Sequence, residues 1–149
     1  MIRPYQESDL PDIIELLSLL KESNEANKFE DVLFDPETYK ETYLVKRTYR
    51  IFVKVENERI VGFILGEHYC NNVYAIIMLY VHPEFRRKQT ALQLKTALTD
   101  YAKENSYKQI ISQVRTNNPE SLRMNAKAGW NLEADKVYPD YYIECSKNL

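Results

Sequence analysis

The first residues of the chain predict a strand followed by an amphipathic helix. Residues 2–5 form a short β-prone run that ends beside a proline. Ser8, Asp9 and Pro11 are typical of a helix start, because short polar side chains cap free amides and the proline ring fits the first turn. Isoleucine and leucine then recur at helical spacing, which predicts a helix to about residue 23 with one buried face.

A loop, a second helix and a hairpin are predicted next. Residues 24–36 are polar and irregular, which indicates a loop, and residues 37–47 then show a helical pattern. From residue 49 the spacing of the apolar residues changes to two. Residues 49–56 and 60–69 therefore predict two antiparallel strands joined by the turn Asn57-Glu58-Arg59.

A strand, a helix and another strand follow. Residues 73–81 come after the turn Asn71-Asn72 as a nearly continuous apolar run, which is expected of a strand covered on both faces. An amphipathic pattern predicts a helix over about residues 88–105, and residues 109–114 predict a strand. Such a βαβ unit joins its two strands by a right-handed crossover, so we expect these strands to run parallel.

The last third of the chain predicts one more helix and a final pair of strands. Asn118 with Pro119 favours a helix start, and Gly129 favours its end. Residues 130–137 and 141–145 predict the two strands. The elements together predict an α/β (α+β) fold in a single domain over residues 1–149. Its mixed sheet would have six to seven strands, flanked by about four helices.

Composition excludes several classes of protein and of partner. The chain has 149 residues, 44% hydrophobic and 28% charged, which is ordinary for a globular protein with a substantial core. Its net charge of −2 disfavours nucleic acid as a partner. It shows no signal peptide and no apolar run long enough for a membrane span. Cys70 and Cys145 lack metal-ligand spacing, so we expect no metal and a reducing, cytoplasmic location.

The candidate chemistry lies where the apolar strand 73–81 leads into the following helix. Free amides at the helix start, the positive end of its dipole and three successive cations, Arg86, Arg87 and Lys88, converge there. Cations at a helix N-terminus oppose the dipole unless an anion binds between them. The segment is therefore a candidate phosphate site, and a solvated helix start without a ligand is the alternative.

This segment and the later run from Asn117-Asn118-Pro119-Glu120 to Ala128-Gly129-Trp130 resemble the GNAT family of acetyl-CoA-dependent N-acetyltransferases, over nearly the whole chain. The family signature Gln/Arg-x-x-Gly-x-Gly/Ala holds the pyrophosphate of coenzyme A by its backbone amides. The resemblance therefore implies acetyl-CoA as co-substrate. The six signature positions are Arg86, Arg87, Lys88, Gln89, Thr90 and Ala91.

Gln89 departs from the signature, which has glycine at this position. The residue keeps its amide, but its Cβ disfavours a positive φ and a very close approach of the phosphate. Affinity for coenzyme A is the property that this departure affects.

The resemblance also implies a slot for the pantetheine arm. In the family the sheet is splayed between the fourth and fifth strands, which here are residues 73–81 and 109–114. Asn118 and Asn125 would face the pantetheine and the thiol. The backbone of three residues would bind the pantetheine amides and the thioester carbonyl: Leu79, Tyr80 and Val81.

The catalytic groups are less clearly marked. Acetyl transfer needs a neutral amine, a polarised carbonyl and a proton donor for the leaving thiol. The positions at which GNAT members place an acid or a base hold Asn125, Gln113 and Ala75 here. The remaining candidates for acid and base are Glu67, His68, Tyr80, Tyr138, Tyr141 and Tyr142. Among them we choose Glu67 as the general base, and a solvated Glu67 with deprotonation of the amine through water is the alternative.

We therefore expect an N-acetyltransferase that transfers acetyl directly to a primary amine, of a small molecule or a peptide, within a ternary complex. A homodimer is compatible with this expectation. The alternative is a catalytically weak or inactive module of the same fold that binds acyl-CoA or another protein. Gln89, Gln113 and Asn125 favour that alternative.

Overall fold

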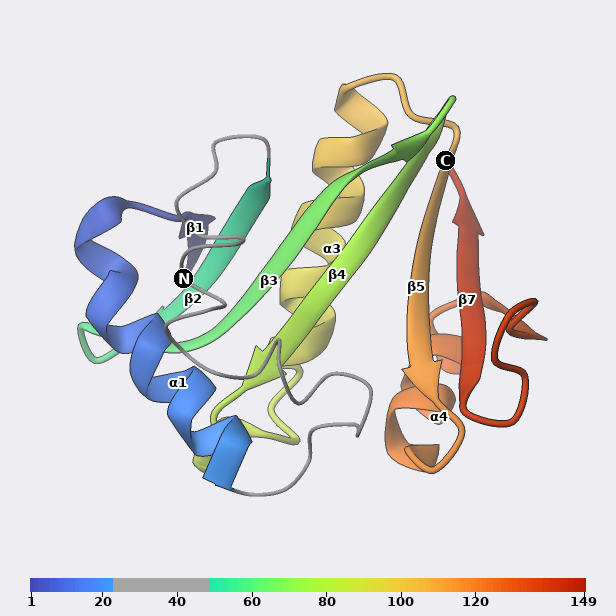
Figure 1. Cartoon of the computed structure of the whole chain (residues 1–149). Coiled ribbons are helices and arrows are strands. Elements are labelled where there is room, and N and C mark those ends of the chain that lie inside the picture. Colours follow the sequence, from blue (N-terminus) through green and yellow to red (C-terminus); the bar gives the residue numbers. More distant parts are fainter. Residues whose placement is uncertain (23–48) are drawn as a thin grey trace.

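A seven-stranded mixed sheet organises the computed structural model, which describes residues 1–22 and 49–149. The strands lie side by side in the order β1-β2-β3-β4-β5-β7-β6 (Figure 1). The loop predicted over residues 24–36 and the helix predicted over 37–47 lie outside the described residues. Within the described part, the predicted mixed sheet is confirmed. The elements are β1 (Ile2–Pro4), α1 (Leu10–Glu22), β2 (Arg50–Glu56), β3 (Arg59–Cys70), β4 (Val73–Val81), α3 (Thr90–Glu104), β5 (Gln109–Arg115), α4 (Pro119–Lys127), β6 (Asn131–Ala134) and β7 (Tyr142–Asn148).

Short-range polar contacts fix the start of the first helix. Two 3-10 turns, Glu7–Asp9 and Pro83–Phe85, precede α1 and α3. Arg3 donates two hydrogen bonds to the Asp9 carboxylate, at 2.7 and 2.8 Å, and the Gln6 amide donates a third at 2.8 Å. The bond from Arg3 holds the pKa of Asp9 below its ordinary value. These contacts tie α1 to the edge strand β1.

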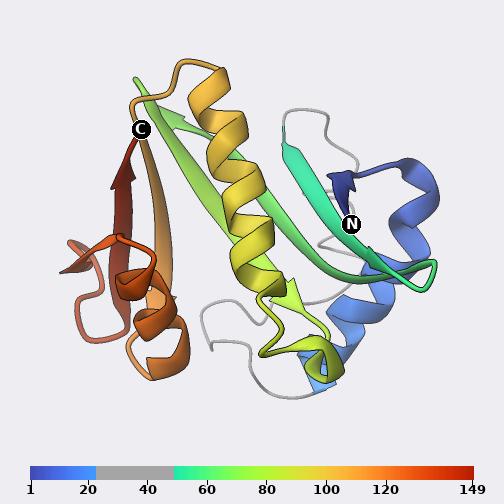
Figure 2. The ribbon, with the colours of Figure 1, turned by 180° about the vertical axis from the view of Figure 1, so that it is seen from behind.

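Helices cover both faces of the sheet. The apolar face of α1 packs with Phe63 and Leu65 of β3, whereas α3 packs on the opposite face with Ile64 of β3. Figure 2 shows α3 and α4 on that second face, with α1 behind the sheet. Within residues 1–22 and 49–149, no helix combines the length and the apolar composition that crossing a bilayer requires.

The two C-terminal strands differ in length from the predictions. β6 ends at Ala134 because the Asp135 carboxylate accepts hydrogen bonds from the amides of Val137 and Tyr138, which turns the chain. β7 continues to Asn148 because it pairs with β5 along its whole length. A strand stays extended while its ladder has a partner, so long-range pairing determines this boundary.

β4 and β5 run parallel and then separate, as predicted. They pair only from Val73 with Gln109 to Ile76 with Ser112, although both strands continue further. Figure 1 shows them diverging toward their C-terminal ends. The predicted splay between the fourth and fifth strands is confirmed.

A β-bulge lies at the point of separation. On β3, Gly66 pairs with Ile76 and Leu65 pairs with Met78, which leaves Ile77 as an extra residue. Tyr74 and Ile76 before the bulge point to the α3 face, whereas Met78, the next alternate position, points to the α1 face. Ile77 itself is 38% exposed, so the expected coverage of this strand on both faces fails at the bulge. A bulge bends its strand and can end pairing, which accounts for the splay.

We predict that Gly66→Ala destabilises the fold. A Cβ at this position would lie 2.7 Å from Leu98 Cδ2, 2.8 Å from Tyr74 Cε1 and 2.9 Å from the Ala75 carbonyl oxygen. Such overpacking costs about 1–3 kcal/mol of unfolding free energy, measurable by chemical denaturation. Gly62→Ala on the same strand is the control, because its nearest contacts would be 3.2 Å and its loss should be smaller. Equal stability of Gly66→Ala and the wild type would contradict this account of the packing.

Candidate functional site

The loop between β4 and α3 has an unusual backbone. His82 caps its 3-10 turn, because its Nδ1 accepts a hydrogen bond from the Glu84 amide at 3.1 Å. Arg87 and Gln89 then both adopt a φ of 63°, in the left-handed region. The helix begins at Thr90 and not near Lys88 as predicted, because the left-handed Gln89 at the N-cap cannot belong to a right-handed helix.

The N-terminus of α3 offers free amides. Its first helical hydrogen bond runs from the Gln93 amide to the Gln89 carbonyl at 2.9 Å, so the three amides of residues 90–92 precede the helical ladder. The Gln89 side chain does not cap them. Thr90 is buried and Ala91 packs against the core cluster that includes Leu94 and Leu98, so their side chains fix the start of the helix. Free amides and the helix dipole together make an anion site.

The three predicted cations of the loop have different partners. Arg86 folds back on β4, where its Nε donates to the Val81 carbonyl at 3.0 Å and its guanidinium lies 5.4 Å from the centre of the Tyr80 ring. Lys88 lies over Phe85 and is exposed. Arg87 is exposed as well, and so is Arg86 in spite of its contacts on β4, so solvent and an anion can reach all three cations.

The start of α4 lies close to this loop across the separated strands. Asn118 caps α4, because its Oδ1 accepts from the Ser121 amide at 3.2 Å, and Pro119 follows in the first turn. Arg87 Nε lies 3.6 Å from the Glu120 carboxylate in that turn. The two helix starts therefore flank the splay. Leu79, Tyr80 and Val81 of β4 lie beyond the last residue that β5 pairs.

Asn125 is buried and fully engaged. Only 1% of it is exposed, its Nδ2 donates to the Ser121 carbonyl at 2.8 Å, and its Oδ1 accepts a hydrogen bond from Lys95 Nζ. The side chain links α4 to α3. Its expected position beside the thiol of coenzyme A stays a prediction.

Lys95 is a buried cation that the sequence did not single out. It is 3% exposed, and its Nζ lies 3.8 Å from the centre of the Trp130 ring. Burial lowers the pKa of Lys95 to about 8, Cys145 on β7 raises it and Lys147 lowers it further. The one available signal was position, since Lys95 lies one turn from Ala91 and from Leu98 on the apolar stripe of the helix.

Glu67 lies on the other face of the sheet. The missing Cβ of Gly66 would point at Leu98 of α3, and successive strand residues alternate, so half-buried Glu67 points to the α1 face. It pairs with Ala75 of β4, two residues before the bulge. Its neighbour His68 contacts the Tyr107 hydroxyl at 3.2 Å instead. The role of Glu67 as a base stays a prediction.

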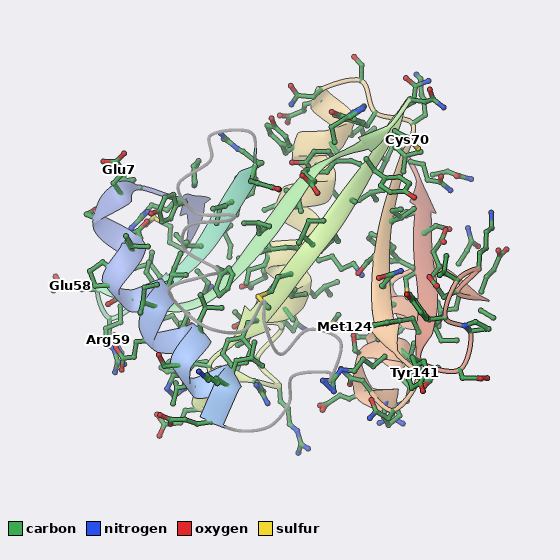
Figure 3. The ribbon with its side chains drawn as sticks, viewed as in Figure 1. Glu7, Glu58, Arg59, Cys70, Met124 and Tyr141 are labelled. Atoms are coloured by element: carbon green, nitrogen blue, oxygen red, sulfur yellow. The ribbon has the colours of Figure 1, made fainter. Side chains whose placement is uncertain are left out.

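Gln113 has a structural partner. Its Nε2 donates to the Asp135 carboxylate at 2.9 Å, which fixes the turn after β6. Hydrogen bonds, first from the Tyr138 amide, hold the pKa of Asp135 below its ordinary value. Tyr141 follows that turn, near the α4 end of the sheet, whereas Cys70 lies at the far end (Figure 3). Among the described residues, no group of three His, Cys, Asp or Glu side chains could hold a metal ion.

Comparisons with known proteins agree with this geometry. Residues 12–130 match the model of the acetyltransferase (GNAT) family. The structure resembles a ribosomal-protein-alanine N-acetyltransferase from Brucella melitensis, with a TM-score of 0.83, 18% identity and coverage of 100% of this chain and 99% of that one. It also resembles PaiA N-acetyltransferase from Thermoplasma acidophilum, solved with coenzyme A, with a TM-score of 0.76, 15% identity and coverage of 100% and 98%. A comparison with curated protein sequences gave no match.

We predict that Gln89→Gly leaves the protein as stable as the wild type or stabilises it by up to about 1 kcal/mol. Glycine relieves the left-handed strain at this position, which offsets the entropy that glycine loses on folding. Thr96→Gly in the exposed, right-handed middle of α3 is the control and should lose roughly 0.3–0.5 kcal/mol, the difference between the helix propensities of threonine and glycine. Urea denaturation measures both. Equal losses at the two positions would contradict the assigned backbone at Gln89.

We predict that Lys95 makes stability depend on pH in the alkaline range. The folded pKa, about 8, lies below the ordinary value of 10.5, so the unfolded chain binds the proton more tightly. The unfolding free energy should therefore rise between about pH 8 and 10.5, by roughly 3 kcal/mol at most, and the penalty is fully present below pH 8.

Denaturation curves across this range test the effect. The unfolding free energy of Lys95→Met should not rise with pH in this range. Lys103 is exposed on the same helix, so Lys103→Met should retain the rise of the wild type. The same pH profile in all three proteins would disprove it.

Proposed function

Because the chain belongs to the GNAT acetyltransferase family, we propose that it transfers the acetyl group of acetyl-CoA directly to a primary amine within a ternary complex. One observation supports this proposal above the others. The free amides at the start of α3 follow a loop whose Arg87 reaches Glu120 in the first turn of α4, and β4 and β5 no longer pair at this end of the sheet. An extended molecule with a phosphate at one end fits such a site.

Each part of the site would bind one part of the co-substrate. The amides of Thr90 and Ala91, with the exposed cations Arg87 and Lys88, would hold the pyrophosphate. Arg87 and Gln89 shape this loop by their left-handed backbone, and Arg86 shapes it by its bond to the Val81 carbonyl of β4. Asn118 and the backbone of Leu79, Tyr80 and Val81, which lies beyond the last residue that β5 pairs, would line the pantetheine arm.

In the proposed reaction, backbone amides of β4 act on the thioester and a side chain on the α1 face acts on the amine. Acetyl-CoA supplies an acetyl group activated as a thioester. Backbone amides of β4 beyond the bulge would polarise its carbonyl. Glu67, on the α1 face, would accept a proton from the acceptor amine. The acceptor, a small-molecule or peptide amine, is therefore expected to approach from the α1 face. We propose the cytoplasm as the location of the enzyme.

A second candidate function rests on a specific observation. Asn125 already bonds Ser121 and Lys95, and Gln113 bonds Asp135, so neither amide is available to the reaction. A binding module of the same fold, which takes up acyl-CoA without turnover, is consistent with that arrangement.

Binding and turnover separate the two functions. Calorimetry should detect coenzyme A and acetyl-CoA, and Lys88→Ala should weaken each by roughly tenfold through loss of a charge-assisted phosphate contact. Free-thiol release with a panel of amines should then show turnover. Glu67→Gln should lower kcat with little change in KM for acetyl-CoA, and Glu133→Gln, exposed on β6, is the matched control.

The outcomes differ for each function. Binding of acetyl-CoA without thiol release for any amine supports the module. Absence of binding to either coenzyme would overturn both functions.

A further inference from the structure

Lys95 is buried without a counterion among the described residues. Its ammonium donates to the Asn125 amide oxygen and lies over the face of Trp130, and no described carboxylate forms an ion pair with it. Burying such a charge costs several kcal/mol, which an amide dipole and a ring face offset only in part. Within residues 1–22 and 49–149, this site therefore holds a cation that has polar and aromatic neighbours but no anionic partner.

The position of the ammonium is the second observation. Cys145 of β7 is close enough to affect the pKa of Lys95, and Cys145 pairs with Ser112 of β5. Ser112 is also the last β5 residue that β4 pairs, with Ile76. Lys95 Nζ bonds Asn125 of α4 and lies over Trp130, so the ammonium bridges α3 and α4. Figure 2 shows these two helices on the same face of the sheet.

The anion expected beside Lys95 is not the phosphate of coenzyme A. Lys95 is five residues into α3, roughly 7 Å along the axis from the helix start where the free amides lie. The phosphate thus has its own site on the exposed loop. The inner end of the bound arm carries the sulfur, the atom that becomes negative when acetyl leaves.

We propose that the Lys95 ammonium pairs with the sulfur of coenzyme A and supplies the proton that converts the departing thiolate into a thiol. This role rests on the proposed function. The acceptor nitrogen bonds to the acetyl carbon, the carbon–sulfur bond breaks with its electron pair on sulfur, and a proton passes from Lys95 Nζ to that sulfur. The acceptor nitrogen loses one proton to Glu67 or water, and neutral Lys95 regains one from solvent.

Among Lys95 and its polar neighbours, Lys95 is the group best suited to donate a proton to the sulfur. Asn125 has no dissociable proton. Burial raises the pKa of the Cys145 thiol, which keeps it protonated, and Lys147 of β7 bonds the Ala128 carbonyl at 3.3 Å. The pKa of Lys95, about 8, lies near that of a free thiol, so a proton exchanges between them with little free-energy change.

Proton release on binding tests the proposal without turnover. The probes are coenzyme A and desulfo-coenzyme A, titrated calorimetrically near pH 7.5 in buffers of different ionisation enthalpy. The wild type should release protons when it binds coenzyme A but not when it binds desulfo-coenzyme A. Its affinity for coenzyme A should be higher by roughly tenfold or more. Ultraviolet absorbance of the bound thiolate gives an independent readout.

Variants assign the effect to one amine. Lys95→Met should bind both probes equally and release no proton, and its kcat should fall with little change in KM. Lys95→Arg keeps the charge but not a dissociable proton, so it should keep the preference for sulfur and lose kcat. Lys103→Met should behave as the wild type.

The failures are distinguishable. Absence of coenzyme A binding in the wild type overturns the proposed function itself. If the wild type binds both probes equally without proton release, the proposed role of Lys95 is wrong and the proposed function stands. This comparison uses the wild type alone, so it does not depend on whether a variant folds. Proton release retained in Lys95→Met also overturns the role.

Discussion

The extra residue Ile77 in β4 is the constraint on which the rest of the site depends. A regular ladder would let β4 and β5 pair to their ends and would keep each side chain on one face of the sheet. The bulge ends that pairing after Ile76 and exchanges the faces of the residues beyond it. The backbone of residues 79–81 is thereby freed from β5, and Arg87 in the loop before α3 reaches Glu120 at the start of α4. One inserted residue thus creates both the opening and its walls.

Local signals in the sequence predicted most of the fold. Period, turns and caps act over a few residues, so the hairpin, the parallel pair and the cap at Asn118 followed from neighbouring side chains alone. The bulge could not be predicted in this way. Ile77 lies in an apolar run from Val73 to Val81, and a run without alternation carries no information about which face a residue occupies. The boundary of β7 depended on pairing with β5, which is also nonlocal.

The candidate site was predictable in its chemistry and not in its contacts. The basic segment before α3 indicated an anion, and the signature position of Gln89 indicated the place of a positive φ, which this residue adopts in spite of its Cβ. Lys95 escaped prediction because a lysine on a helix is normally solvated and its partner Asn125 is 30 residues away. A buried pair of this kind is visible only once α3 and α4 are placed on the same face.

The sheet separates two electrostatic environments that the proposed reaction requires. On the α3 face the free amides, Arg87, Lys88 and Lys95 all present positive charge, which favours the anionic co-substrate and a negative sulfur. On the α1 face Glu67 presents negative charge, which favours an acceptor amine that is cationic in water. In the proposed reaction, the two reactants would be attracted to opposite faces and would meet where β4 and β5 separate. The amine must lose a proton and the sulfur must gain one, and each face holds the group suited to that transfer.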